Sequence, residues 1–350
     1  MEICLSHMTA LRWYSQNPNP RAGARPCRAT NVPGKPPTAY TAQRILRVIG
    51  YNSPIDVLIS NPNGNHASRQ VKTHVTALNY PEGSFVPIFK IGKTQVFATS
   101  PELTLLLISR SKPIDEIAYL GTLLCSNYRL NGNTSIGITQ RGKGDCPPTN
   151  HARISLYTTE NKDLPNATKL TKALPYILDN SKSPMESGIA LTLALPVRHG
   201  GFNLGIPELN ASVSLPQARN ALGAAKRQTR YPDIMFASGT NGERRVGIDY
   251  DSAAVHARIS SFGKDAERRN QIATFGSFTH LVMTPEQALE FNSFRRTADF
   301  ARRALGLRPQ PQLRKSAADA DSQRILEQAW NRQFALWAKF VCHGGPQDLK

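Results

Sequence analysis

The sequence has few cysteines, and they form no pattern that predicts a metal site or a disulfide framework. Its five cysteines are scattered over 350 residues, are odd in number and include no Cys-x-x-Cys pair. This usage argues against a small disulfide-linked fold and against a structural zinc site. A reducing compartment is the expected environment, and we predict a cytoplasmic protein.

Long hydrophobic runs are also missing. The longest apolar segment, residues 188–197, includes Pro196 and is shorter than the roughly 20 residues that a membrane-spanning helix needs. The first residues, MEICLSHMTALRW, lack the basic start and the long apolar stretch of a signal peptide. The sequence therefore predicts no membrane partner.

Acidic residues are scarce relative to basic ones. The chain has 25 Asp and Glu against 43 Lys and Arg, a formal net charge of +18. A surface with this excess attracts polyanions, because contacts with phosphates release condensed counterions. Nucleic acid is therefore the expected partner; generic basicity without such a partner is the alternative reading.

The first half of the sequence predicts a leader and an α+β domain. Residues 1–37 are rich in Pro, Arg, Asn and Gly without a hydrophobic period, so we expect a disordered leader. Residues 38–180 mix strand-like and helix-like patterns. Strands are expected over residues 56–60, 70–76, 84–90, 94–99 and 153–157, and helices over 41–49, from Ser100-Pro101, from Pro113 and over 167–178.

Residues 181–305 predict a second domain with elements in the order αβββαβα. Ser183 and Glu186 have the spacing of a capping box, which begins a helix over 184–195. The dipeptide Asn241-Gly242 between two apolar runs predicts a hairpin. The remaining elements are expected at 211–215 (strand), 264–275 (helix), 278–283 (strand) and 284–305 (helix), before a basic linker and C-terminal helix over 306–350.

Carboxylates gather at one end of the predicted hairpin. Asp233 precedes its first strand, Asp249 and Asp251 end its second, and His256 follows a few residues later. Acids two residues apart on a strand point to the same face, and crowded carboxylates repel each other unless they share a cation such as Mg²⁺. In the alternative reading, Asp233 starts a turn after Pro232 and the other two acids end a strand in solvent.

The element order and these acids resemble the PD-(D/E)xK restriction-endonuclease-like family, in the branch of the very short patch repair endonuclease. The resemblance covers residues 183–290 and rests on Pro232-Asp233, GIDYDSAAVH, KDAERRNQI and FTHLVMTPEQ. It implies a mixed sheet flanked by helices, with Asp233 and Asp249 as ligands of Mg²⁺ or Mn²⁺. It also implies catalytic roles for Glu186, Asp251 and His256, and DNA phosphodiester hydrolysis as the activity.

The sequence departs from the family pattern at one position that bears on catalysis. Asp251 occupies the place where the family carries a lysine, and a carboxylate cannot offset phosphate charge. The patch-repair branch also lacks that lysine and relies on histidine, so His256 is the expected substitute. A non-catalytic nucleic-acid-binding regulator that keeps the nuclease fold is therefore the alternative function.

Two further features concern partners. Residues 41–160, with TSPELTLLLISRS and PIDEIAYLGTLLCSNYRL, resemble the effector half of AbiEi-type antitoxins, which implies a regulatory protein as a second candidate partner. Basic residues around the predicted nuclease core are expected to contact phosphates. They are Arg227, Arg230, Lys264, Arg268, Arg269, Arg295 and Arg296.

Overall fold

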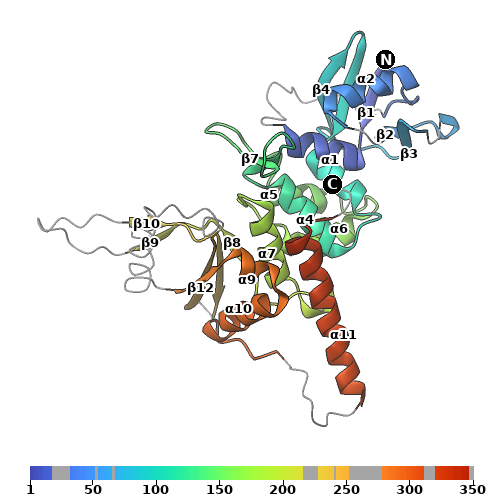
Figure 1. The fold of residues 1–350 in the computed structure, drawn as a ribbon. Coiled ribbons are helices and arrows are strands. Elements are labelled where there is room, and N and C mark those ends of the chain that lie inside the picture. The colour runs from blue at the N-terminus through green and yellow to red at the C-terminus, as the bar shows by residue number, and fades with distance from the viewer. Residues whose placement is uncertain are drawn as a thin grey trace, which may run out of the picture. The chain divides into compact units, whose positions relative to one another are not determined.

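The protein contains both helices and mixed sheets and divides into two compact units (Figure 1). Our computed structural model describes residues 1–17, 32–51, 54–64, 68–215, 228–239, 242–251, 278–310 and 320–346. Unit 1 extends to Ile177, and unit 2 begins at Leu178. None of the helices in these ranges combines the length and the apolar character needed to cross a bilayer.

A five-stranded sheet with strand order β3-β2-β1-β5-β4 forms the centre of unit 1. The middle strand β1 runs parallel to β5 and antiparallel to β2. The strands are β1 (Glu2–Leu5), β2 (Ile55–Ile59), β3 (Val71–Val75), β4 (Phe85–Ile91) and β5 (Thr94–Thr99).

The prediction of a disordered leader over 1–37 is wrong for its first 17 residues. β1 occupies the middle of the sheet, and helix α1 (His7–Gln16) packs against α3 (Pro101–Ile108) and β2 with Leu11 and Tyr14 fully buried. The apolar residues of β1 are too few to show a period, and they become core residues only because strands from elsewhere pair with them. The rest of the predicted leader that the structure describes, from Val32 onward, reaches α2; residues 18–31 lie outside the described ranges.

The helices of unit 1 begin mostly where capping residues predict them. Ser100 accepts a hydrogen bond from the N–H of Leu103 at the start of α3. The helices are α2 (Ala39–Ile49), α3 (Pro101–Ile108), α4 (Ile114–Leu124), α5 (His151–Glu160) and α6 (Ala167–Ala173), with 3₁₀ turns η1 (Pro62–Gly64) and η2 (Leu174–Tyr176). A small hairpin joins β6 (Tyr128–Leu130) to β7 (Ile138–Gln140).

The strand predicted over 153–157 is a helix instead. The side chain of Asn150 accepts the N–H of Arg153 and caps α5. Ile154 and Thr158, four residues apart, are both buried on its inner face. Ile154 and Tyr157 favoured a strand, but the cap and this helical spacing decided the structure.

Unit 2 is built on a four-stranded mixed sheet with strand order β13-β12-β11-β8. β11 runs antiparallel to both β8 and β12, whereas β13 runs parallel to β12. The strands are β8 (Glu208–Leu209), β11 (Ile234–Ser238), β12 (Arg244–Tyr250) and β13 (Thr279–Met283).

Two predictions about unit 2 need correction. The strand expected at 211–215 is β9 (Val213–Leu215), which pairs with β10 (Gln228–Arg230) in a separate two-stranded sheet, so β8 takes the place beside β11. The helix expected over 284–305 is interrupted. Glu290 separates α9 (Pro285–Leu289) from α10 (Phe291–Ala304) and caps the latter through its carboxylate.

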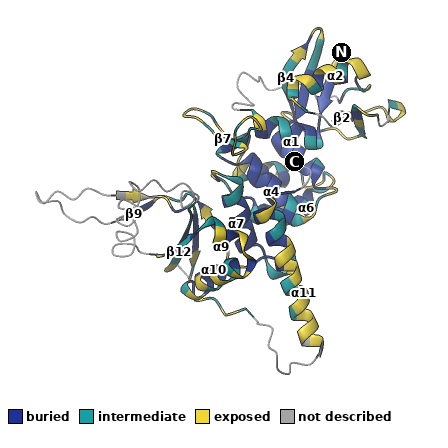
Figure 2. Ribbon diagram, in the orientation of Figure 1, coloured by how far each residue is buried: buried dark blue, intermediate teal, exposed yellow. Residues whose placement is uncertain are grey.

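The main buried cluster of unit 2 lies on the face of the sheet that carries Ile234, and Figure 2 shows buried residues in dark blue. Ile234, Phe236, Val246 and Ile248 are fully buried there against α7 (Pro184–Ala194) and α10. A short 3₁₀ turn, η3 (Val197–His199), follows α7. The helix predicted over 264–275 lies outside the described residues.

The C-terminal helix is part of this core rather than a separate tail. Helix α11 (Ala320–Trp337) continues as one π-helical turn, η5 (Ala338–Cys342), which packs on α7. The backbones approach so closely that a Cβ at Gly188 would collide with the carbonyl of Phe340. Trp337 and Val341 therefore complete the core, while Ile325 near the start of α11 stays exposed.

Candidate active site at the end of the β11–β12 hairpin

Asp233 and Asp249 lie side by side at one end of the hairpin. The register pairs Ile234 with Ile248, so Asp233 stands opposite Asp249 on the neighbouring strand. The N–H of Asp233 donates to Asp249 Oδ1 at 3.1 Å, and the N–H of Tyr250 donates to Asp233 Oδ2 at 2.8 Å. Because side chains alternate between faces and Ile234 points into the core, both carboxylates belong to the opposite face of the sheet.

His280 on β13 orients Asp249. The parallel register places Val282 beside Asp249 and His280 beside Gly247, on the face that carries the two acids. His280 Nε2 lies 3.0 Å from Asp249 Oδ2, and the two side chains are 10% and 13% exposed. Sequence reasoning missed His280, although a polar residue in the middle of an apolar strand was an available signal.

Glu186 approaches the hairpin from the first turn of α7. Its carboxylate accepts the N–H of Lys182 at 2.9 Å, the amide of Asn210 at 3.1 Å and the hydroxyl of Ser183 at 3.3 Å. The predicted capping box is half correct, because Ser183 accepts the N–H of Glu186 but Glu186 returns to Lys182 instead of the Ser183 backbone. A helix start thus holds an almost fully buried carboxylate near Asp233.

Asn210 links Glu186 to Asp233, and no sequence pattern pointed to it. Its side-chain amide donates to Glu186 and to the carbonyl of Asn180, and its N–H donates to the carbonyl of Asp233 at 3.0 Å. The residue adopts a left-handed backbone with φ of 53°, which asparagine tolerates better than most residues. This geometry sets the position of α7 relative to the hairpin.

The crowded acids perturb each other. Burial raises the pKa of Asp233 to about 7, with contributions from the charges of Glu186 and Asp249, against the opposing effects of the Tyr250 N–H and the Lys182 ammonium. Burial also raises the pKa of Glu186, although its hydrogen bonds and Lys182 counteract the shift. The site therefore favours a bound cation, or a proton on Asp233, near neutral pH.

In EDTA, the free energy of unfolding of unit 2 should fall as the pH rises from about 4 to about 7. An unfolded Asp has a pKa of about 3.9, so in this window native Asp233 keeps a proton that the unfolded chain has lost. Above the native pKa, Asp233 is ionised in both the native and the unfolded state, and the decrease in the free energy of unfolding, on the order of 2–4 kcal/mol, is complete. Urea denaturation at several pH values measures this decrease. Asp233→Asn should remove this component, and an unchanged pH profile in the variant would contradict the assignment.

The structure places the other predicted catalytic residues as follows. Asp251 comes one residue after β12, and its N–H donates to the carbonyl of Met283, which extends the pairing with β13. His256 lies outside the described residues. The structure therefore brings Asp233, Asp249 and Glu186 together.

The predicted phosphate-contacting residues are described only in part. Arg296 lies 3.8 Å from the carboxylate of Glu290 and donates to the hydroxyl of Ser293, while Arg295 lies above the ring of Phe291. Both belong to the first turns of α10. Arg230 is described only through its backbone in β10, and the remaining positions fall outside the described ranges, namely Arg227, Lys264, Arg268 and Arg269.

The chemistry of the site fits a hard divalent cation held by two carboxylates. In the described ranges, no group of three or more His, Cys, Asp and Glu side chains is placed to hold a metal ion. Mg²⁺ needs no such cage, because one or two carboxylates commonly bind it while water fills its other positions. Asp233 Oδ1 accepts no hydrogen bond from any described residue, so this oxygen could bind such an ion.

Comparison of the chain with protein-family models, with curated proteins and with solved structures gives no match in any of the three. The inference of function therefore starts from the geometry of this site and from the sequence resemblance.

Proposed function

We propose that unit 2 is a metal-dependent endonuclease domain of the PD-(D/E)xK kind that hydrolyses DNA phosphodiester bonds. The observation that carries the proposal is the cross-strand pair of Asp233 and Asp249, with Glu186 close to Asp233. Three acids are gathered at one end of the sheet, two of them with raised pKa values. Such perturbed and converging groups are typical of functional sites.

The topology of unit 2 supports the same proposal. A helix, α7, precedes three antiparallel strands, and the last of these, β12, pairs in parallel with β13. Parallel neighbours need a crossover connection, and residues 251–278 supply it. This order agrees with the αβββαβ core that the resemblance implies, with the helix over 264–275 remaining a prediction.

Each residue of the proposed site has a separate role. Asp233 and Asp249 would hold Mg²⁺ or Mn²⁺, an ion that activates water and stabilises charge on phosphate oxygens when bound. His280 fixes the orientation of Asp249, as a partner of a metal ligand does. Lys182, whose ammonium lowers the pKa of Asp233, supplies the positive charge that Asp251 cannot. His256 remains the predicted proton-transfer group.

A second candidate function is DNA binding without catalysis. The acid at Asp251, where the family carries lysine, favours it. A regulator of this kind would bind DNA through its basic surface and, by the AbiEi-like resemblance of unit 1, a regulatory protein. A cytoplasmic location is part of both proposals.

Binding to duplex DNA should weaken steeply with salt under both functions. The formal charge of +18 allows several phosphate contacts, and four contacts would lower the affinity about 100-fold between 50 and 200 mM salt. Titration of a labelled duplex at these salt concentrations measures the slope. Replacing Arg295 and Arg296 with Gln should reduce the slope of log affinity against log salt concentration by about two. Lys90→Gln in unit 1 should leave this slope unchanged.

Detectable binding that does not change with salt would contradict both candidate functions. A cleavage assay with supercoiled plasmid DNA in Mg²⁺ or Mn²⁺ then separates them. The nuclease proposal expects nicked and linear products that EDTA abolishes. The binder proposal expects the plasmid to stay intact, with the same affinity of the protein for DNA in the metal ion and in EDTA.

A further inference from the structure

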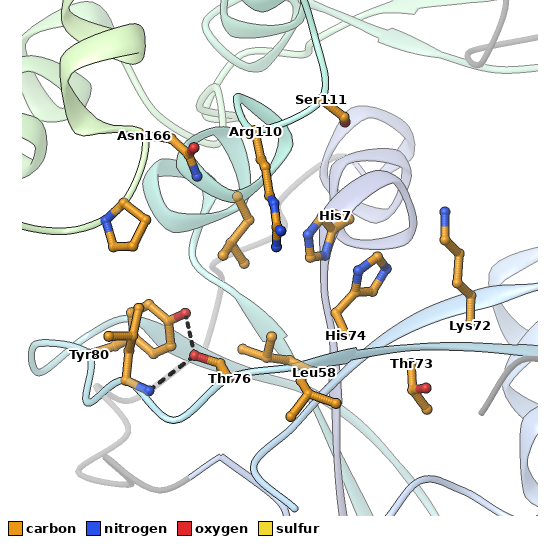
Figure 3. A pocket seen from close by; sticks show the side chains of 14 residues that line it. His7, Leu58, Lys72, Thr73, His74, Thr76, Tyr80, Arg110, Ser111 and Asn166 are labelled. Carbon is orange, nitrogen blue, oxygen red and sulfur yellow. Dashed lines mark hydrogen bonds between the residues drawn. The ribbon is translucent and has the colours of Figure 1, made fainter. Parts of the chain in front are cut away.

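Unit 1 contains a cavity of about 800 Å³ that the proposed nuclease does not use (Figure 3). It lies between the start of α1, strands β2 and β3, the end of α3 and the start of α6. A volume of this size is within the range of small-molecule sites, roughly 300–1,000 Å³.

One side of the cavity is cationic. Lys72 from β3 and Arg110 after α3 line it together with His7 and His74, and Figure 3 shows the Arg110 side chain reaching toward the two imidazoles. The residues described as lining it include no Asp or Glu. Neither Lys72 nor Arg110 has an ion-pair partner among the residues that the structure places, so both charges are available to a ligand.

The two histidines form a fixed pair. Their rings stack with centroids 3.6 Å apart, and His74 Nε2 lies 2.8 Å from Asp56 Oδ1. Asp56 is buried and is held in turn by Thr9, whose hydroxyl lies 3.3 Å from Asp56 Oδ2. This chain of contacts orients His74 toward its partner before any ligand arrives.

The backbone of His7 has an unusual conformation at this point. Its φ of 46° lies in the left-handed region, which non-glycine residues rarely adopt outside functional or tightly constrained positions. Burial, together with the charges of His74, Lys72 and Arg110, lowers the pKa of His7 to about 3 against the opposing effect of Asp56. His7 is thus a neutral hydrogen-bonding group, and the positive charge comes from Lys72 and Arg110.

The opposite side of the cavity is largely apolar. Leu58, Leu78 and Leu107 line it, and Tyr80 adds an aromatic ring whose hydroxyl lies 3.1 Å from the Thr76 hydroxyl. A ligand that fits both sides must carry an anionic group at one end and an apolar, preferably planar, group at the other. Phosphate suits the first, because Arg and Lys bind it with charge-assisted hydrogen bonds.

We propose that this cavity binds a small phosphorylated molecule of nucleotide size. Arg110 and Lys72 contact its phosphate, the His7–His74 pair offers ring nitrogens beside them, and Leu58, Leu78 and Tyr80 contact its apolar part. This inference concerns unit 1 alone and does not depend on nuclease activity in unit 2.

Isothermal titration calorimetry with the full chain in EDTA tests the proposal. The probes are the four common nucleoside 5′-monophosphates, the corresponding nucleosides, inorganic phosphate and a short single-stranded oligonucleotide. The variants are Arg110→Gln and Lys72→Gln. Their matched controls are Arg47→Gln and Lys90→Gln, which change exposed cations of unit 1 that do not line the cavity.

At least one mononucleotide should bind, at least about tenfold more tightly than its nucleoside and than inorganic phosphate. Arg110→Gln and Lys72→Gln should each weaken this binding about tenfold or more, while the two controls leave it unchanged. Circular dichroism melts of all four variants should match the wild type, because the four side chains are exposed.

The proposal is overturned if no mononucleotide binds, or if phosphate or the nucleoside binds as tightly as the nucleotide. It is also overturned if the cavity variants and their controls lose the same amount of affinity for the nucleotide. Binding of the oligonucleotide alone would also overturn it and would assign the cationic side to a nucleic-acid strand.

Discussion

Plasmid cleavage in Mg²⁺ should fall at least about 1,000-fold when Asp233 is changed to Asn. The substitution keeps the size of the side chain and an oxygen that can accept the Tyr250 N–H, which now lies 2.8 Å from Asp233 Oδ2. It removes the charge that attracts the ion. A loss of this size corresponds to about 4 kcal/mol of transition-state stabilisation, which a bound metal ion readily supplies.

Glu243→Gln is the matched control for this experiment. Glu243 is an exposed carboxylate at the other end of the same hairpin, so its removal changes the net charge equally but leaves the site intact. Its cleavage rate should equal that of the wild type. His280→Gln should have an intermediate effect, about 10- to 100-fold, because it disturbs only the orientation of Asp249. Equal rates in Asp233→Asn and wild type would contradict the nuclease assignment.

Thermal melts of the same proteins separate metal binding from catalysis. Mn²⁺ at millimolar concentration should raise the melting temperature of the wild type, because an ion that binds only the native state stabilises it by mass action. Asp233→Asn should show no such rise. Its metal-free form should be at least as stable as the wild type, since burial disfavours the charge it loses. A wild-type midpoint that does not respond to Mn²⁺ would exclude both acids as ligands.

The second large effect concerns the core beneath the site. Phe294→Ala should lower the free energy of unfolding of unit 2 by about 3–5 kcal/mol. Phe294 on α10 is fully buried, and its ring packs against Phe202 with centroids 5.6 Å apart. Removing the ring forfeits its burial and leaves a cavity between α10 and the segment after α7, which the backbone can close only partly.

Phe300→Ala provides the control on the same helix. Phe300 is 54% exposed, so its removal should change the free energy of unfolding by no more than about 0.5 kcal/mol. Urea denaturation followed by tryptophan fluorescence reports mainly on unit 2, because two of the three tryptophans, Trp330 and Trp337, belong to it. Similar losses in both variants would show that α10 is not anchored through its inner face.

Local signals in the sequence correctly predicted the helix caps and the hairpin, whose structure depends on residues close together in the chain. Ser100 and Thr284 cap helices through their side chains as predicted, and the Asn-Gly dipeptide lies between two strands that pair in register. The position of Asp233 opposite Asp249 followed from that hairpin alone. In each case the backbone preference and the partner lie within a few residues of each other in the chain.

Local signals failed where distant segments compete. Residues 1–17 show no hydrophobic period, yet β1 is the middle strand of a sheet whose partners come from residues 55–59 and 94–99. At β1 the tertiary packing decided the structure, because burial outweighs propensities of a few tenths of a kcal/mol per residue. Over 153–157 the expected strand was wrong for a different reason, because the cap at Asn150 and the four-residue spacing of the buried Ile154 and Thr158 are local helix signals that the prediction did not use.

The sequence by itself determined the α+β character, the basic charge, the β11–β12 hairpin and the pairing of its two acids. Only the tertiary structure decided that His280 contacts Asp249, that Asn210 ties Glu186 to Asp233, and that His7 stacks on His74. The reason is physical. Hairpins and caps are set by backbone preferences over a few residues, whereas these contacts join segments that meet only after the sheets have formed and their cores have closed.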